Sequence, residues 1–88
     1  MSQDSLTFKV SRLYRVNGEG ALRAFADLSI ADSILIRGIR IIEGQKGLFV
    51  SMPKQQGKDS RWYDTVRPLS KEMREEISTT VLTAYKSE

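Results

Sequence analysis

The chain of 88 residues contains no cysteine and no histidine. Without thiolates it has neither disulfide bonds nor cysteine zinc sites, and without imidazole it lacks the side chain that enzymes most often use as a general base. Its carboxylates are scattered over turns and one helix face, and no pair is spaced to share a proton or hold a metal ion. We therefore expect a protein that is not an enzyme, with no metal ion, cofactor or small-molecule substrate.

Long apolar stretches are missing as well, since no run of about 18 apolar residues is present to cross a bilayer. The first five residues are polar and lack the basic and then apolar order of a signal peptide. We expect a disordered leader over residues 1–5, a single domain over residues 6–88, and no membrane partner. The missing cysteine agrees with a reducing compartment, so we expect a cytoplasmic protein.

Basic residues outnumber acidic residues slightly, 14 against 11, which gives a net charge of +3. They are concentrated in residues 9–15 and 54–67. Such segments attract polyanions, but arginines on predicted strands also suit the solvent-exposed face of a sheet. Both interpretations stay open for Arg12, Arg15, Arg23, Arg37 and Arg40, and we expect some of these arginines to pair across strands with Asp27 or Glu43.

Alternation of apolar and polar residues predicts four successive antiparallel strands, with turns that contain glycine after the first and the third. Interruptions of the alternation near Ser11 and at Gly38 predict two β-bulges. In the second strand, Asp27 falls on the face expected to meet solvent. After a polar loop over residues 53–60, residues 62–66 predict a short fifth strand at a sheet edge, ending before Pro68. The predicted strands cover residues 6–16, 22–30, 34–43, 48–52 and 62–66.

From Ser70 onward, apolar residues recur every three or four positions, which predicts a helix of about four turns with Ser70 as its amino-terminal cap. Leu82 falls opposite the apolar stripe, either as a tolerated single exposed residue or as a contact for a partner. The predicted fold class is α+β: a twisted antiparallel meander of about five strands with a C-terminal amphipathic helix packed on it. The stripe consists of Met73, Ile77, Val81, Ala84 and Tyr85.

The segment Gly47-Leu48-Phe49-Val50-Ser51-Met52-Pro53 leads from an apolar strand into a loop that contains Lys54, Lys58 and Arg61. These cations precede Trp62 and Tyr63, and nucleic-acid-binding surfaces combine cations for phosphates with aromatic rings for bases. In the alternative interpretation, Trp62 is buried between the sheet and the helix and the lysines are solvated.

The same residues resemble the stage V sporulation protein G family, also called septation protein G, of bacteria. The resemblance covers about residues 8–85 and is strongest in the Gly47 to Pro53 segment. It implies a homodimer that binds DNA, and in some members RNA, to regulate gene expression, with links to septation and sporulation in cell division. The other matching residues are Arg12-Leu13, Arg15-Val16-Asn17, Leu22-Arg23-Ala24, Ile39-Arg40-Ile41-Ile42-Glu43-Gly44, Asp64, Pro68, Val81-Leu82 and Tyr85.

By this resemblance, nucleic acid binds the loop that begins at Lys54 and the start of the helix. Typical members carry a Lys-Arg pair where this chain has Gln55 and Gln56, and a Gly-Lys pair where it has Glu75 and Glu76. Those acids would repel a phosphate backbone unless they face away from it or read cytosine amino groups. The predicted nucleic-acid-binding residues are Lys54, Gln55, Gln56, Lys58, Arg61, Arg74 and Ser78.

Two alternatives to the binding of duplex DNA stay open. In the first, the protein is an interaction module that recruits a division or regulatory protein through exposed sheet edges and Leu82. In the second, single-stranded RNA stacks on Trp62 and Tyr63.

Overall fold

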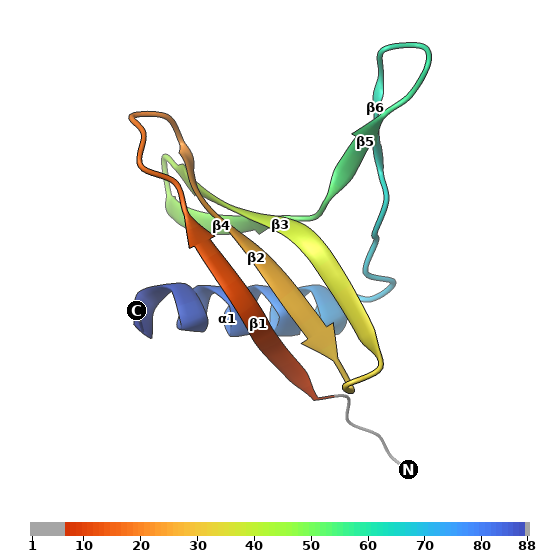
Figure 1. Ribbon diagram of the computed structural model, residues 1–88. Helices are drawn as coiled ribbons and strands as arrows, with labels where there is room; N and C mark the ends of the chain where they lie inside the picture. Colours follow the sequence, from red (N-terminus) through yellow and green to blue (C-terminus); the bar gives the residue numbers. More distant parts are fainter. Residues whose placement is uncertain (1–6, 88) are drawn as a thin grey trace.

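Four antiparallel strands form the main sheet of the computed structural model, which describes residues 7–87 (Figure 1). They are arranged in the order β1-β2-β3-β4, so each strand pairs with its neighbour in the sequence as predicted. The disorder expected for residues 1–5 lies outside the described residues. The strands are β1 (Phe8–Arg15), β2 (Leu22–Ile30), β3 (Ile34–Gly44) and β4 (Gly47–Ser51).

Both predicted bulges are present. The register of β1 against β2 shifts between Val10 and Arg12, and the register of β2 against β3 shifts between Ala26 and Leu28, opposite Gly38. Gly38 has a φ of 82°, a conformation that glycine adopts without the steric cost of a side chain. The prediction that Asp27 meets solvent was wrong, since Asp27 lies opposite the bulge, is only 8% exposed and accepts the backbone N–H of Gly38 at its Oδ1.

A second, two-stranded sheet replaces the predicted fifth strand of the meander. Strands β5 (Lys54–Gln56) and β6 (Trp62–Asp64) pair with each other, and Figure 1 shows this hairpin, the arm (residues 54–64), projecting away from the main sheet. The prediction of a single strand at a sheet edge was therefore wrong. All six strand residues of the arm are exposed, so backbone pairing rather than burial of an apolar face forms these strands.

The helix α1 (Lys71–Ser87) covers one face of the main sheet, which confirms the predicted α+β class (Figure 1). Ser70 is its cap, since Ser70 Oγ accepts the backbone N–H of Met73 at 3.1 Å. Among residues 7–87, no helix is long and apolar enough to cross a membrane. The buried apolar core consists of Ala24, Ala26, Leu28, Ile36, Ile39, Ile41, Ile77 and Val81.

Two contacts near the end of α1 differ from or add to the predicted apolar stripe. Leu82 is half-buried against the core rather than turned to solvent, because the helix lies across the sheet and presents more than one row of side chains to it. Arg15 of β1 donates from Nη2 to the carbonyl oxygen of Tyr85 at 2.6 Å, and its guanidinium lies 4.4 Å from the Tyr85 ring centroid. Both contacts fix the helix on the sheet.

Candidate functional site

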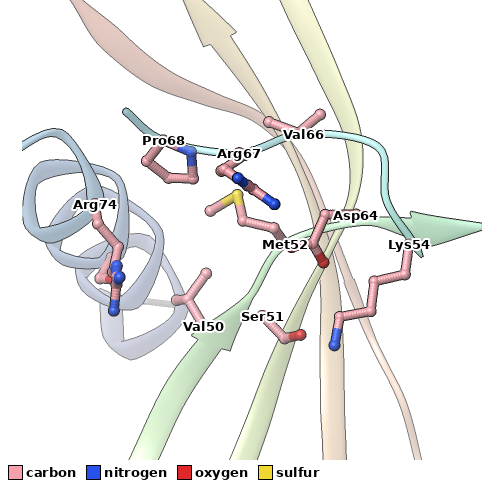
Figure 2. Close-up of a pocket in the computed structure, with 10 residues that line it drawn as sticks. Val50, Ser51, Met52, Lys54, Asp64, Val66, Arg67, Pro68 and Arg74 are labelled. Carbon is pink, nitrogen blue, oxygen red and sulfur yellow. The ribbon is translucent and has the colours of Figure 1, made fainter. Parts of the chain in front are cut away.

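A groove of about 400 Å³ lies between the end of β4, the base of the arm and the first turns of α1 (Figure 2). Its apolar lining comes from Val50, Met52, Val66 and Pro68. Its polar lining comes from three different parts of the chain, namely the end of β4 with the arm, the segment that returns from the arm, and the helix. These polar residues are Ser51, Lys54, Asp64, Arg67, Arg74 and Ser78.

Three cations surround the groove. Lys54 is the first residue of β5, Arg67 lies in the segment that joins β6 to the helix, and Arg74 lies on α1 (Figure 2). The ion pair found within residues 7–87 joins Arg23 to Glu43 at 2.9 Å, so none of the three groove cations is in an ion pair there. The carboxylate that lines the groove belongs to Asp64, the register partner of Lys54.

The start of α1 sets the position of Arg74. The Ser70 side chain caps the helix, and the backbone N–H of Arg74 donates to the Ser70 carbonyl oxygen at 3.2 Å. Residues four apart on a helix lie on the same face, which places Ser78 beside Arg74 along the groove. The cap therefore connects helix formation to the geometry of the groove.

The acidic residues of the helix lie on a different face from Arg74. Glu75 and Glu76 line a separate shallow hollow with Glu72, Thr79 and Thr80. Glu75 and Glu76 therefore face away from the groove, as the sequence analysis required for a phosphate backbone bound there. Arg74 therefore lines the groove without a carboxylate of its own helix among the other lining residues.

The predicted site residues fall into two groups. Lys54, Arg74 and Ser78 come together at the groove, whereas the others belong to the arm. On the arm, the Gln56 side chain donates from Nε2 to the Ser60 carbonyl oxygen at 3.2 Å, which holds the turn. The remaining arm residues of the prediction, all exposed, are Gln55, Lys58 and Arg61.

Trp62 and Tyr63 are 59% and 50% exposed, so the interpretation that buried Trp62 between sheet and helix was wrong. The arm stands away from both elements (Figure 1). The Tyr63 hydroxyl donates to Asp59 Oδ2 at 2.5 Å, and the backbone N–H of Arg61 donates to Asp59 Oδ1 at 3.1 Å. Both bonds lower the pKa of Asp59, and the bond from Tyr63 has the larger effect. In turn, the hydrogen bond to the Asp59 carboxylate raises the pKa of Tyr63.

Sequence reasoning missed Arg67 as a member of the site. It lies in an irregular segment, where no periodicity indicates which way a side chain points. The sequence feature that could have indicated Arg67 is its position directly before Pro68, in the short connection that leads back to the helix. Three unpaired cations around one groove suit a ligand with several negative charges, such as a phosphate backbone.

Comparison with known proteins agrees with this architecture over nearly the whole chain. The sequence matches the SpoVG family over residues 7–87. It is 38% identical over 77 residues to a protein of Archaeoglobus fulgidus, covering 88% of this chain and 91% of that protein. It is 35% identical over 80 residues to a protein of Heliobacterium modesticaldum, covering 91% of this chain and 90% of that protein.

A protein of Brevibacillus brevis is 39% identical over 74 residues, covering 84% of this chain and 78% of that protein. All three relatives are named "Putative septation protein SpoVG". The match spans the main sheet, the arm and the helix, and so includes every element that forms the groove. The chain belongs to the SpoVG family.

Proposed function

We propose that this protein is a regulator of gene expression that binds duplex DNA through the groove. Lys54, Arg67 and Arg74 contact backbone phosphates, and Ser78 donates or accepts a hydrogen bond at a phosphate or a base edge. The observation that supports this most directly is the meeting of three unpaired cations from separate parts of the chain at one groove. No catalytic step is part of the proposal.

The arm extends the same surface. Lys58 and Arg61 are exposed on it beyond the groove, where they supply further phosphate contacts. Because Gln55 and Gln56 are neutral, Lys54 is the cation that β5 supplies, and most of the charge that meets DNA comes from the groove rather than from the rest of the arm. The proposal therefore gives Lys54 and Arg74 a larger share of the affinity than Lys58 and Arg61.

Salt dependence tests the assignment. Each phosphate neutralised by a protein cation contributes about 0.9 to the slope of log affinity against log salt concentration on duplex DNA. We expect the double variant Lys54→Ala, Arg74→Ala to reduce that slope by about two, because two phosphate contacts are lost. The measurement is a fluorescence-anisotropy titration of labelled duplex DNA at several salt concentrations.

The matched control removes the same charge from elsewhere. Lys46 and Lys86 are exposed and do not line the groove, so Lys46→Ala, Lys86→Ala should leave the slope nearly unchanged. Equal reductions of the slope in both double variants would reject the groove and leave only net charge as the cause. A wild-type protein without salt-sensitive DNA binding would reject the proposal itself.

A homodimer in the cytoplasm is the form that we propose for the regulator. The resemblance to the family favours the dimer, and so does the size of the chain, because a domain of 88 residues buries a modest share of its surface alone. Three relatives carry the word septation in their names, and we propose a role in the same process for this chain.

A second candidate function is an interaction module that recruits a protein of cell division. The observation that favours it is Leu69, which is 94% exposed beside an apolar hollow lined by Ile30, Ile36 and Met73. Under this alternative the basic residues contribute only to solubility. It predicts no salt-sensitive binding to DNA, so the titration above separates the two functions.

A further inference from the structure

The face of the main sheet that α1 does not cover has its own set of side chains. Ala24 and Ala26 are fully buried in the core beneath the helix, so Phe25 between them points to the opposite face. The register continues this row across the sheet, because Phe25 pairs with Tyr14 on one side and with Arg40 on the other. No helix or strand of residues 7–87 covers this open face (Figure 1).

Aromatic rings on the open face are accessible. Tyr14 and Phe49 are each 48% exposed, and Phe25, the register partner of Tyr14, is half-buried. The Tyr14 hydroxyl accepts a hydrogen bond from Arg12 Nη1 at 2.9 Å, which restrains the ring. Exposed, restrained rings on a sheet are surfaces on which unpaired bases stack.

Arginines surround these rings. Arg12, Arg37 and Arg40 are exposed, and none of them is in an ion pair within residues 7–87. Glu43, the exposed acid of β3, is already paired with Arg23 at 2.9 Å. The open face therefore combines aromatic rings with three exposed arginines against one carboxylate, that of Asp27 opposite Arg12, and its excess of positive charge complements a polyanion.

A shallow hollow on this face is lined by Tyr14, Phe25, Asp27, Arg37 and Gly38. Asp27 is 8% exposed, and its Oδ1 accepts the Gly38 N–H at 3.3 Å. Its second carboxylate oxygen has no hydrogen-bond donor among residues 7–87. A nearly buried carboxylate oxygen without a donor is costly, so it is ready to accept a hydrogen bond from a ligand.

We propose that the open face is a second nucleic-acid site, which binds single-stranded RNA and takes one unpaired guanine in the hollow. The base stacks on Tyr14 and Phe25, and Arg37 and Arg40 contact the flanking phosphates. We infer that the bound strand is RNA, because the loops and bulges of RNA present unstacked bases, and proteins read the Watson–Crick edges of such bases.

Guanine follows from the chemistry of the carboxylate. A carboxylate only accepts hydrogen bonds, and the Watson–Crick edge of guanine presents an N–H and an amino group side by side. Adenine and cytosine place an acceptor beside their amino group, and uracil places its N–H between two carbonyl oxygens. Each of these three bases would bring an acceptor against the carboxylate.

The test uses a short labelled RNA with one guanine in a run of uridines, titrated by fluorescence anisotropy. Tyr14→Ala should weaken binding by about 5- to 150-fold, because loss of one base–aromatic stack costs about 1–3 kcal/mol. Tyr14→Leu keeps the apolar contact and should show most of the same loss while folding normally. Arg37→Gln, which changes an exposed side chain, should also weaken binding.

Asp27→Asn tests the base. Its carbonyl oxygen still accepts the Gly38 N–H, but its amide group now presents a donor to the ligand. We expect the preference for the RNA with guanine over the same RNA with adenine to disappear. A preference that persists unchanged would overturn the assignment of Asp27.

The control is Tyr63→Ala, because Tyr63 is 50% exposed on the arm and is as accessible as Tyr14. Loss of RNA binding in Tyr63→Ala but not in Tyr14→Ala would move the single-strand site to the arm and overturn the proposal. So would a Tyr14 variant whose mass in light scattering differs from that of the wild type, since a second copy would then cover the open face.

The experiments test the groove and the open face independently. Tyr14→Ala should leave duplex DNA binding and its salt slope unchanged, whereas Lys54→Ala, Arg74→Ala should leave the guanine preference unchanged. Absence of single-stranded RNA binding in the wild type would overturn this proposal and leave the groove proposal standing.

Discussion

At the scale of single residues, Ser70 links stability to the groove. Its side chain accepts the Met73 N–H at 3.1 Å, and its carbonyl oxygen accepts the Arg74 N–H at 3.2 Å. A capping side chain satisfies one of the backbone donors that a helix leaves free at its start. The first turn of α1 is thereby fixed, and with it the base of the Arg74 side chain.

We expect Ser70→Ala to lower the free energy of unfolding by about 1 kcal/mol, because the Met73 N–H loses its acceptor. For a domain of this size that corresponds to a fall in Tm of about 4–8 °C, measurable by thermal denaturation followed by circular dichroism. Ser70→Asn retains an acceptor and serves as the control, with a Tm close to that of the wild type. A similar fall in both variants would contradict the role of Ser70 as a cap.

At the scale of elements, the main sheet and α1 followed from the sequence, whereas the arm did not. Alternation and glycine turns indicate a half-buried sheet, and the spacing from Met73 to Tyr85 indicates a helix, because burial of one face imposes a period. In β5 and β6 no face is buried, so the sequence has no period to detect. The burial of Asp27 depends on a pairing across the bulge, which no local pattern records.

The candidate site was predicted in part for the same reason. Lys54 is marked by its place directly after Met52-Pro53, which close the apolar strand, and Arg74 by its place at the helix start. Their common groove depends on how far the arm base lies from α1, which only the fold determines. Arg67 has neither kind of signal, since its segment is irregular.

The hydrogen bond between Tyr63 and Asp59 is one of several that close the arm, and the pH dependence of its contribution follows from the two pKa shifts. Folding lowers the pKa of Asp59, so this contribution to arm stability is present above its unfolded pKa and is lost as pH falls through the folded value. Folding raises the pKa of Tyr63, so the contribution is present below its unfolded pKa and is lost as pH rises through the folded value.

We therefore expect the arm to be most ordered between about pH 4 and about pH 10, the ordinary pKa values of the two groups. Asp59→Asn should bring the pKa of Tyr63 down toward its ordinary value, because the charged acceptor is gone. An NMR titration of the Tyr63 ring resolves this pKa from those of the other two tyrosines. A Tyr63 pKa that is the same in the wild type and in Asp59→Asn would contradict the bond in solution.

At the scale of the whole molecule, the main sheet divides the surface into parts with different chemistry. One face holds α1 and, where the helix begins, the groove with its unpaired cations. The other face holds aromatic rings and arginines. A third region, near the start of α1, is apolar, since Leu69 is 94% exposed beside a hollow of about 250 Å³. Arg67 lines both this hollow and the groove, so a dimer formed through the apolar region would border the groove and leave the open face accessible.

We expect Leu69→Asp to convert the proposed homodimer to monomers, because a charge would replace an apolar side chain in the contact. The milder Leu69→Ala should raise the dimer Kd by about tenfold to hundredfold, since burial of a leucine side chain is worth about 1.5–3 kcal/mol. Light scattering over a concentration series measures both effects. The control is Phe49→Ser, which changes a 48% exposed ring on the open face and should leave the dimer intact.

The pattern of outcomes locates the contact. Monomers from Leu69→Asp together with dimers from Phe49→Ser place the interface at the start of α1 and leave the open face available for RNA. The reverse pattern would place a second copy on the open face, and would contradict both this interface and the second nucleic-acid site. A wild-type mass of one subunit throughout the concentration series would contradict the dimer, and a single groove per molecule would then limit the length of DNA that one protein contacts.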